Sequence, residues 1–378
     1  MKTFAFNFAL LLALLCVGFT FTGLSQSKKE ASFTVSNGDL LDVSLRQGNI
    51  SITTGSGNEV KVIAKNIEAD ELSLLTMEKK QGKVEIKFKG EDSDDFELEL
   101  TIPSEMNLDI STGGGNISVK GDLKGTVDAR TGGGNITAGN ILGKTEFSTA
   151  GGNISVGDIN GDADFASAGG DIKAGSINGK AEIATAGGNI NIGSVNSSAE
   201  ISTAGGNITV NDIGGNAEIS TAGGNITVGN VSGSSEISTA GGNLSLESAN
   251  GKVEVSTAAG NIKLKNINGS VEASTAAGNI YAEIYPEGNT KSELNSAVGN
   301  ITLKIPGNAK VTIIATLSVA AWGGSDDALD HIKSDFTATE VNKREDKRQI
   351  EAIYKLNGGG PTIELNASMG EIEIRKLN

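Results

Sequence analysis

The chain has 378 residues, a formal net charge of −15, and 52 glycines but only 4 prolines. The negative charge argues against nucleic acid or an anionic membrane as a partner. The scarcity of proline excludes a collagen-like or proline-rich chain. Aromatic residues make up only 4% of the sequence, so a folded core must be built from aliphatic side chains.

Residues 1–25 have the pattern of a secretory signal peptide. Lys2 precedes an apolar run from Phe4 to Phe21, and small residues stand at the positions before a cleavage site after Ser25. A retained membrane anchor is disfavoured because no second apolar stretch follows. Cys16 lies inside this run and lacks the preceding small residue of a lipoprotein signal. We therefore expect an exported, cysteine-free mature chain found in the cell envelope, on the cell surface or outside the cell.

Residues 26–107 alternate apolar and polar side chains, as in "SFTVS" and "KVEIKFK", which is typical of β-strands. A hairpin is predicted through Lys79–Lys83, and "QGNISITTG" at Gln47–Gly55 is an early degenerate copy of the repeat described next. This segment is predicted to form irregular β coils that cap the repeat, because an open solenoid end is prone to aggregation.

Residues 108–304 repeat one 18-residue phrase, with Asn207 and Asn225 as a typical pair of equivalent positions. We number the positions of each repeat from Ala217–Ser234, "AEISTAGGNITVGNVSGS". Positions 1, 3, 5, 10, 12 and 15 are mostly apolar or threonine, and glycine occupies position 8 in all twelve copies from Gly115 to Gly370. Each repeat therefore predicts a strand, a glycine turn, a second strand, a short apolar step and another turn.

Two short strands cannot enclose a core alone, so each repeat must bond to the repeats above and below it. The predicted fold is all-β, a single-stranded parallel β-solenoid with 18-residue coils and capping segments at both ends. Right-handed winding is the default expectation for parallel crossovers. Position 9 is almost always asparagine and predicts a ladder of side-chain amides along the axis. Glycine at position 8 is expected to supply either a positive φ or a close turn.

Position 2 is acidic in every copy and is expected to face outward. Its members are Asp109, Asp128, Glu146, Asp164, Glu182, Glu200, Glu218, Glu236, Glu254, Glu272, Glu293 and Glu364. One interpretation is a charged stripe that prevents pairing with other molecules. The other is a Ca²⁺-binding stripe, for which Glu182, Glu200, Glu218, Glu236 and Glu254 are the weak candidate ligands. We favour the first interpretation and expect no cofactor, because spaced single carboxylates offer few oxygens.

Residues 305–378 interrupt the repeat with a large excursion before a closing coil at Ile363–Leu377. The excursion contains the only histidine, His331, close to Asp326, Asp327 and Asp330. A short surface helix capped by Ser325 is the favoured interpretation of this stretch, and a metal site is the alternative.

The mature chain contains the phrases "LDVSLRQGNISI", "FELELTIPSEMNLDISTGGGNISV", "STAGGNI" and "GGGPTIELNASMGEIEI". It resembles the bacterial putative-adhesin family of strand-repeat domains of unknown function, relatives of adhesin-head GIN domains. The resemblance implies a β-solenoid in the bacterial cell envelope and supplies no catalytic residues.

From the sequence we expect an exported non-enzymatic module that binds an envelope or cell-surface glycan or protein, or that serves as a spacer. Uniform repeats offer no isolated acid, base and cation site, so no catalytic residue is assigned. The alternative is a β-helix enzyme that acts on polysaccharide. A carboxylate pair lying with a base in a groove, outside the ladder, would favour that alternative.

Overall fold

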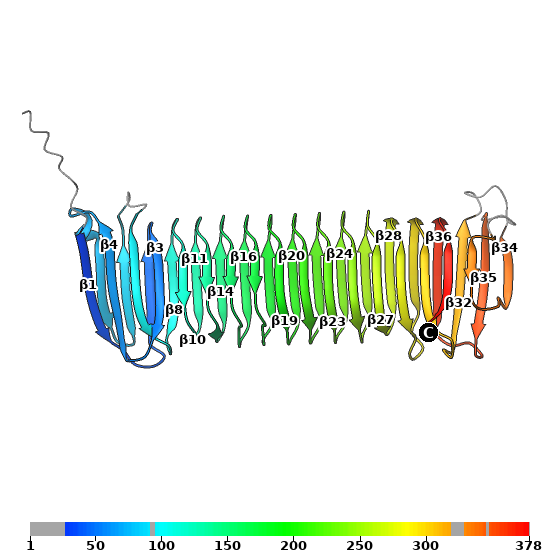
Figure 1. Cartoon of the computed structure of the whole chain (residues 1–378), viewed down its shortest axis with the longest axis horizontal. Coiled ribbons are helices and arrows are strands. Elements are labelled where there is room, and N and C mark those ends of the chain that lie inside the picture. The colour runs from blue at the N-terminus through cyan, green and yellow to red at the C-terminus, as the bar shows by residue number, and fades with distance from the viewer. Residues whose placement is uncertain (1–26, 91–94, 319–328, 345–347, 378) are drawn as a thin grey trace, which may run out of the picture.

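The computed structural model describes residues 27–90, 95–318, 329–344 and 348–377, and the predicted signal peptide lies outside them. These residues form one straight rod of stacked coils (Figure 1). Regular structure is almost entirely β, with one 3-10 helix at Glu71–Leu74 among the named elements. No helix in the described ranges has the length and apolar character needed to cross a membrane.

Each regular coil contributes one strand to each of two parallel sheets. Strands of the first sheet cover positions 1 to 5 or slightly more: β8 (Asn107–Thr112), β11 (Val127–Thr131), β14 (Thr145–Thr149), β16 (Ala163–Ser167), β18 (Ala181–Thr185), β20 (Ala199–Thr203), β22 (Ala217–Thr221), β24 (Ser235–Thr239), β26 (Val253–Thr257), β28 (Val271–Ala277) and β30 (Ser292–Val298). Strands of the second sheet begin near position 10: β9 (Ile117–Lys120), β12 (Ile136–Ala138), β15 (Ile154–Val156), β17 (Ile172–Ala174), β19 (Ile190–Val195), β21 (Ile208–Ile213), β23 (Ile226–Val231), β25 (Leu244–Ala249), β27 (Ile262–Asn268), β29 (Ile280–Tyr285) and β31 (Ile301–Pro306).

Neighbouring coils pair in the register that the repeat predicts. Ile208 lies opposite Ile226, and Glu200 lies opposite Glu218. A third, shorter side is made by position 15, where the two-residue strands β10 (Leu123–Lys124) and β13 (Ile141–Leu142) pair. The all-β solenoid predicted from the repeat is confirmed.

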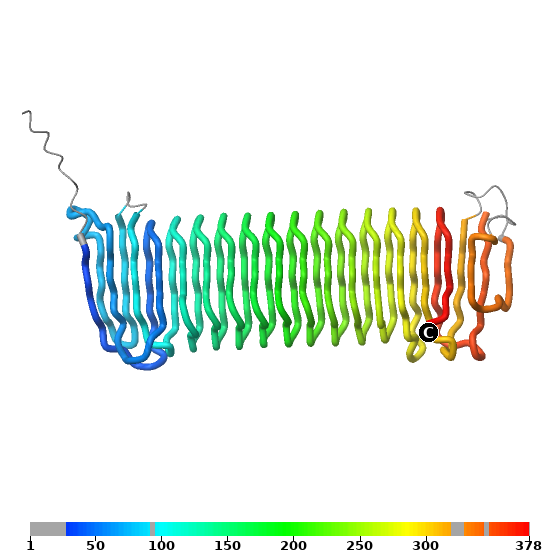
Figure 2. The backbone as a smooth tube through the Cα atoms, viewed as in Figure 1, coloured from blue at the N-terminus to red at the C-terminus, as the bar shows by residue number. Residues whose placement is uncertain are grey.

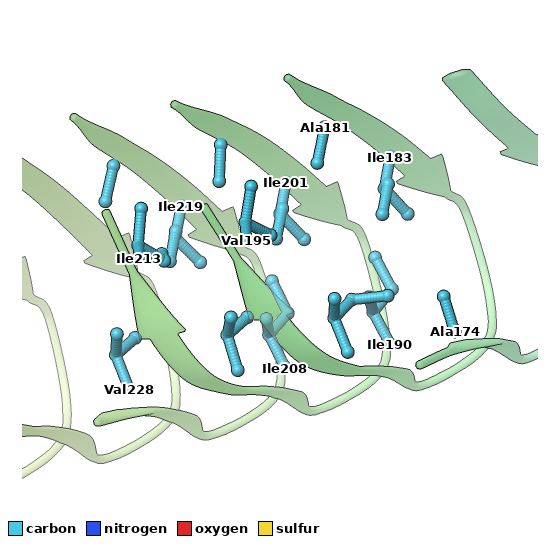
Figure 3. Close-up of a cluster of buried hydrophobic side chains, with 14 of the residues drawn as sticks. Ala174, Ala181, Ile183, Ile190, Val195, Ile201, Ile208, Ile213, Ile219 and Val228 are labelled. Atoms are coloured by element: carbon cyan, nitrogen blue, oxygen red, sulfur yellow. The ribbon is translucent and has the colours of Figure 1, made fainter. Parts of the chain in front are cut away.

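The core is a continuous aliphatic column between the sheets (Figure 3). Ile201, Ile208 and Ile213 come from positions 3, 10 and 15, and each is only 1% exposed or less. The apolar periodicity of the sequence therefore assigned the inward positions correctly.

At the start of the chain, the coils do not follow one another in sequence order. The strands are β1 (Ser27–Thr34), β2 (Leu40–Leu45), β3 (Asn49–Gly55), β4 (Glu59–Ile67), β5 (Leu75–Lys80), β6 (Lys83–Phe88) and β7 (Glu97–Pro103). The coil of β2 and β3, here called the N-terminal coil, pairs with β8 and β9 on one side and with β6 and β7 on the other. It is a regular coil, although an irregular cap was expected there.

The other end has the same arrangement. The strands are β32 (Val311–Ser318), β33 (Ile332–Ser334), β34 (Glu340–Arg344), β35 (Gln349–Leu356), β36 (Thr362–Met369) and β37 (Ile372–Leu377). The coil of β36 and β37, here called the C-terminal coil, pairs with β30 and β31 on its inner side and with β32 and β33 on its outer side. The structure places this coil inside the rod's end, whereas the sequence suggested that it closes the rod. In Figure 2 the N-terminal coil (mid-blue) lies inward of the light-blue strands that follow it in the chain. The C-terminal coil (red) lies inward of the orange strands that precede it.

The outermost strands at both ends are antiparallel or very short. β1 pairs with β4, β5 with β6 in the predicted hairpin, and β34 with β35, all antiparallel. β33 has only three residues. The edge strands β1, β5 and β34 carry lysine and glutamate along their length, which discourages end-to-end pairing of rods.

Candidate binding face on the first sheet

The corner after each strand of the first sheet is held by glycine at position 8. A Cβ atom on Gly224 would lie 1.9 Å from the carbonyl oxygen of Gly206 in the preceding coil. The equivalent contact at the other eleven copies is equally short, and a positive φ occurs only at Gly299 and Gly370. Of the two roles expected for this glycine, close approach of backbones is therefore the general one.

The threonine at position 5 and the asparagine at position 9 close the same corner. The Thr221 hydroxyl donates to the Gly206 carbonyl at 3.0 Å and accepts from the Gly224 N–H at 3.3 Å. The Oδ1 atom of Asn207 accepts from the backbone N–H of Asn225 at 2.9 Å and from its Nδ2 at 3.2 Å. The predicted amide ladder is present, and its hydrogen bonds identify this corner as scaffold.

The acidic side chains at position 2 form one continuous row, here called the acidic ladder. Consecutive members lie directly opposite each other from Asp109 to Glu364. The ladder also extends in the N-terminal direction through Asp42 to Glu85, which the sequence did not reveal. The signal was weak there, because this region lacks the repeated phrase.

Lysines neutralise the ladder on both sides of its centre. Lys180 pairs with Glu182, and Lys252 pairs with Glu254. These carboxylates raise the pKa of each lysine through a hydrogen bond to its ammonium group. Within the described residues, no ion pair reaches the three glutamates between them, Glu200, Glu218 and Glu236. The sequence has no lysine or arginine from residue 181 to residue 251, so the centre of the ladder is purely anionic.

The five candidate calcium ligands are thus in register but differ in surroundings. Glu200, Glu218 and Glu236 line a shallow trough of about 340 Å³ that has Lys180 and Lys252 at its ends. Glu182 and Glu254 are engaged by those lysines. No group of three or more acidic, histidine or cysteine side chains in the described part of the chain has the geometry to hold a metal ion.

Arg130 is the one basic side chain at position 4, where other coils of the block have mostly serine or alanine. Its guanidinium pairs with Asp128, and its nearest nitrogens lie 4.0 Å from Asp109 and Glu146. Burial raises the pKa of Asp128, against the lowering effect of the guanidinium. Arg130, Asp128, Glu146 and Asp164 border a hollow of about 180 Å³. The alignment of repeats could have singled out Arg130, because it is the only charged residue at position 4.

Beside the ladder, a long groove follows the rod over eight coils. It has a volume of about 1240 Å³ and is lined by positions 4, 5 and 6. Position 6 is alanine throughout, as in Ala204 and Ala222, and position 4 is serine or alanine, as in Ser202 and Ser220. We call this feature the small-residue groove. Seven steps of about 4.8 Å make it roughly 34 Å long.

Only part of the predicted histidine cluster lies within the described residues. Ser325, Asp326 and Asp327 lie outside the described residues, so the expected helix cap is not seen. The Nδ1 atom of His331 lies 3.3 Å from Glu371 Oε1, and Lys333 pairs with the other oxygen of Glu371 at 2.7 Å. These contacts fasten the edge strand β33 to the C-terminal coil.

Comparison with solved structures gives matches of low identity. A "putative adhesin" of Bacteroides fragilis is 13% identical, with a TM-score of 0.26, and the match covers 94% of this chain and 99% of that one. A "putative adhesin" of Parabacteroides distasonis is 13% identical, with a TM-score of 0.29 and coverage of 94% and 98%. A "putative lipid binding protein" of Parabacteroides distasonis is 14% identical, with a TM-score of 0.22 and coverage of 93% and 97%. No curated protein matches the sequence.

Comparison with protein families gives two overlapping matches to one family. They cover residues 25–218 and 198–375, and they overlap inside the regular block. Strand pairing runs through this overlap without a break, from β20 to β22 and from β21 to β23. The two matches therefore describe one continuous solenoid, and the chain belongs to the Toastrack DUF4097 family.

Proposed function

We propose that this protein is an exported, non-enzymatic binding rod of the bacterial cell envelope or surface. It holds an elongated ligand, a glycan or an extended protein segment, along the small-residue groove. The observation that carries this proposal is the straight groove itself, which repeats the same chemistry over eight coils. A signal-peptide pattern at residues 1–25 and membership of the Toastrack family support the envelope location.

The groove suits a ligand with a repeating structure. Alanine methyl groups provide apolar contact, and serine hydroxyls offer hydrogen bonds at regular intervals. The neighbouring acidic ladder disfavours a polyanion, since like charges repel. We therefore expect an uncharged or cationic chain rather than an acidic one.

The test measures binding of the chain without residues 1–25 to three probes. These are soluble hydroxyethyl cellulose, gelatin and alginate, which represent a neutral glycan, an extended protein and a polyanion. The variant Ala204→Tyr/Ala222→Tyr fills the groove and should weaken binding to the preferred probe by about tenfold or more. Thr209→Tyr/Thr227→Tyr places the same side chains at exposed sites of the same coils on the second sheet and is the matched control.

Binding to the cellulose or gelatin probe that is lost only in the groove variant supports the proposal. Equal binding by both variants, or no binding to any probe, contradicts it. Surface labelling of intact cells separately tests exposure of the rod.

A glycan-acting enzyme is the second candidate. The carboxylates at the hollow are members of the acidic ladder, and the observation that favours the enzyme is the guanidinium of Arg130, which lies among them. Asp128 there has a raised pKa next to a guanidinium in a concave site. Release of reducing ends from a polysaccharide, abolished by Arg130→Ala, would favour the enzyme over the binding rod.

A further inference from the structure

The C-terminal coil occupies a slot whose two walls come from earlier parts of the chain. Its inner wall is the coil of β30 and β31, and its outer wall is formed by β32 and β33. Both walls precede the C-terminal coil in sequence. The coil can therefore leave the slot, or enter the slot of another molecule, only when contacts to both walls are broken or made.

The contacts that fill the slot are extensive and noncovalent. Leu365, Ile372 and Ile374 are fully buried in it. On the inner side, the Gly299 N–H donates to the Met369 carbonyl at 2.8 Å. On the outer side, the Ile372 N–H donates to the His331 carbonyl at 2.9 Å. An empty slot would expose these apolar walls and unpaired strand edges to solvent, which gives a strong driving force for filling it.

A single connection, Asn357–Pro361, joins the C-terminal coil to the rest of the described rod. Asn357, Gly358 and Gly359 all have positive φ values, of 49°, 92° and 79°. This left-handed run reverses the chain tightly and is exposed at Asn357, Gly358 and Gly360. Fully extended, five residues would span about 17 Å. The connection can therefore act as a hinge with a folded and an extended form.

We propose that the C-terminal coil is exchangeable, and that the coil of one copy can fill the slot of a second copy of this chain. Exchange conserves the contacts of the coil, because the donor and acceptor slots are identical, and only the hinge changes conformation. The partner is therefore another molecule of the same protein. The N-terminal coil differs, since residues 35–39 and 56–58 tether it on both sides to the capping strands β1 and β4.

A disulfide between chains reports exchange directly. The Asn366 Nδ2 atom donates to Asn295 Oδ1 at 2.8 Å across the inner wall, which places these two side chains within reach of a disulfide. A chain carrying Asn295→Cys is mixed with a chain carrying Asn366→Cys, both without residues 1–25 and therefore without any other cysteine. The mixture is unfolded, refolded at high concentration and oxidised. A covalent dimer then forms when the coil of the second chain enters the slot of the first.

The N-terminal coil provides the control pair, Ser44→Cys and Ser111→Cys, which lie opposite each other in β2 and β8. We expect the Asn295→Cys/Asn366→Cys mixture to give at least tenfold more covalent dimer on a non-reducing gel. Equal yields from the two mixtures, or no dimer from the first, overturn the proposal. A single chain with both asparagines replaced, refolded at high dilution so that exchange between molecules is suppressed, should form an internal disulfide as a monomer, which confirms the geometry.

Gly358→Ala tests the hinge separately. A Cβ atom there meets nothing within 4 Å, so the substitution acts only on the positive φ. The folded hinge becomes less favourable while the extended hinge is unaffected. The dimer fraction of this variant, measured by size-exclusion chromatography after refolding of the cysteine-free chain, should rise about fivefold or more. An unchanged dimer fraction contradicts the hinge role.

Discussion

Gly224 and Gly223 are adjacent in the chain but have different structural roles. Position 8 is packed against the backbone of the preceding coil, whereas position 7 faces open space on one side. A Cβ on Gly224 would lie 1.9 Å from a carbonyl oxygen, and one on Gly223 would lie 3.4 Å from its nearest neighbour. The sequence predicted that position 8 needs glycine but could not choose between positive φ and close approach, because both exclude a side chain.

Gly224→Ala should therefore destabilise the rod strongly, by about 3 kcal/mol or more, because two backbones must move apart. Gly223→Ala is the matched control, and we expect it to change stability by less than about 1 kcal/mol. Thermal unfolding followed by circular dichroism measures both. Similar melting temperatures for the two variants would show that the glycine at position 8 does not set the distance between neighbouring coils.

At the scale of a strand, the acidic ladder places like charges opposite one another along the whole first sheet. Adjacent carboxylates at about 4.8 Å repel by roughly 1 kcal/mol in water. The sequence predicted this row in the regular block, where the repeat aligns its members. It missed the small-residue groove, because alanine and serine at positions 4 and 6 carry no chemical signal until neighbouring coils are stacked.

Added NaCl should raise the melting temperature by screening the ladder, and CaCl₂ at equal ionic strength should add nothing further. Glu200→Gln/Glu218→Gln/Glu236→Gln should reduce the NaCl effect, since it removes the unneutralised centre. A calcium-specific rise that is lost in this variant would instead establish a calcium site on the ladder.

The strand β6 carries Glu85, a carboxylate whose pKa is strongly lowered. Lys87, followed by Lys83, lowers its pKa from 4.5 to about 2. The other charged groups facing it are Lys80, Glu78 from β5 and Asp42 from β2. A carboxylate with a lowered pKa in the folded state stabilises that state above pH 4.5, and the contribution disappears as the pH falls towards 2.

We therefore expect the melting temperature to fall between pH 4.5 and pH 2, and Glu85→Gln to make this fall shallower. Glu99→Gln, on β7, the next strand along the chain, is the control, because Lys65 is the one lysine that pairs with Glu99 among the described residues. If the melting temperatures of the native chain and the Glu85 variant change identically with pH, Glu85 does not stabilise the folded state in the way described.

At the scale of the whole molecule, neighbouring coils pair in the same register throughout, but at the two ends of the rod they are not stacked in the order of the sequence. Every coil carries nearly the same pattern, so the sequence predicts how any two coils pair without predicting which two are neighbours. That ambiguity explains why the solenoid could be predicted while the internal positions of the N-terminal and C-terminal coils could not. It also explains why the ladder members Asp42 and Glu85 were missed.

Removal of one complete coil, Ala217–Ser234, should leave a folded rod, because Ser235 then takes the place of Ala217 opposite Ala199. We expect a length decrease of about 4.8 Å by small-angle X-ray scattering and only a small change in melting temperature. Removal of Ala217–Asn225 alone is the control, since half a coil moves every following residue off its column. A folded product from that control would contradict the fixed coil length.

The interlocked ends determine how the rod responds to mechanical force. In a solenoid with coils in sequence order, tension on a terminus peels away the last coil by breaking one ladder at a time. Here the C-terminal coil is bonded on both sides, to β30 and β31 and to β32 and β33. Tension on Leu377 must therefore rupture two hydrogen-bonded ladders together before any coil of the regular block can detach.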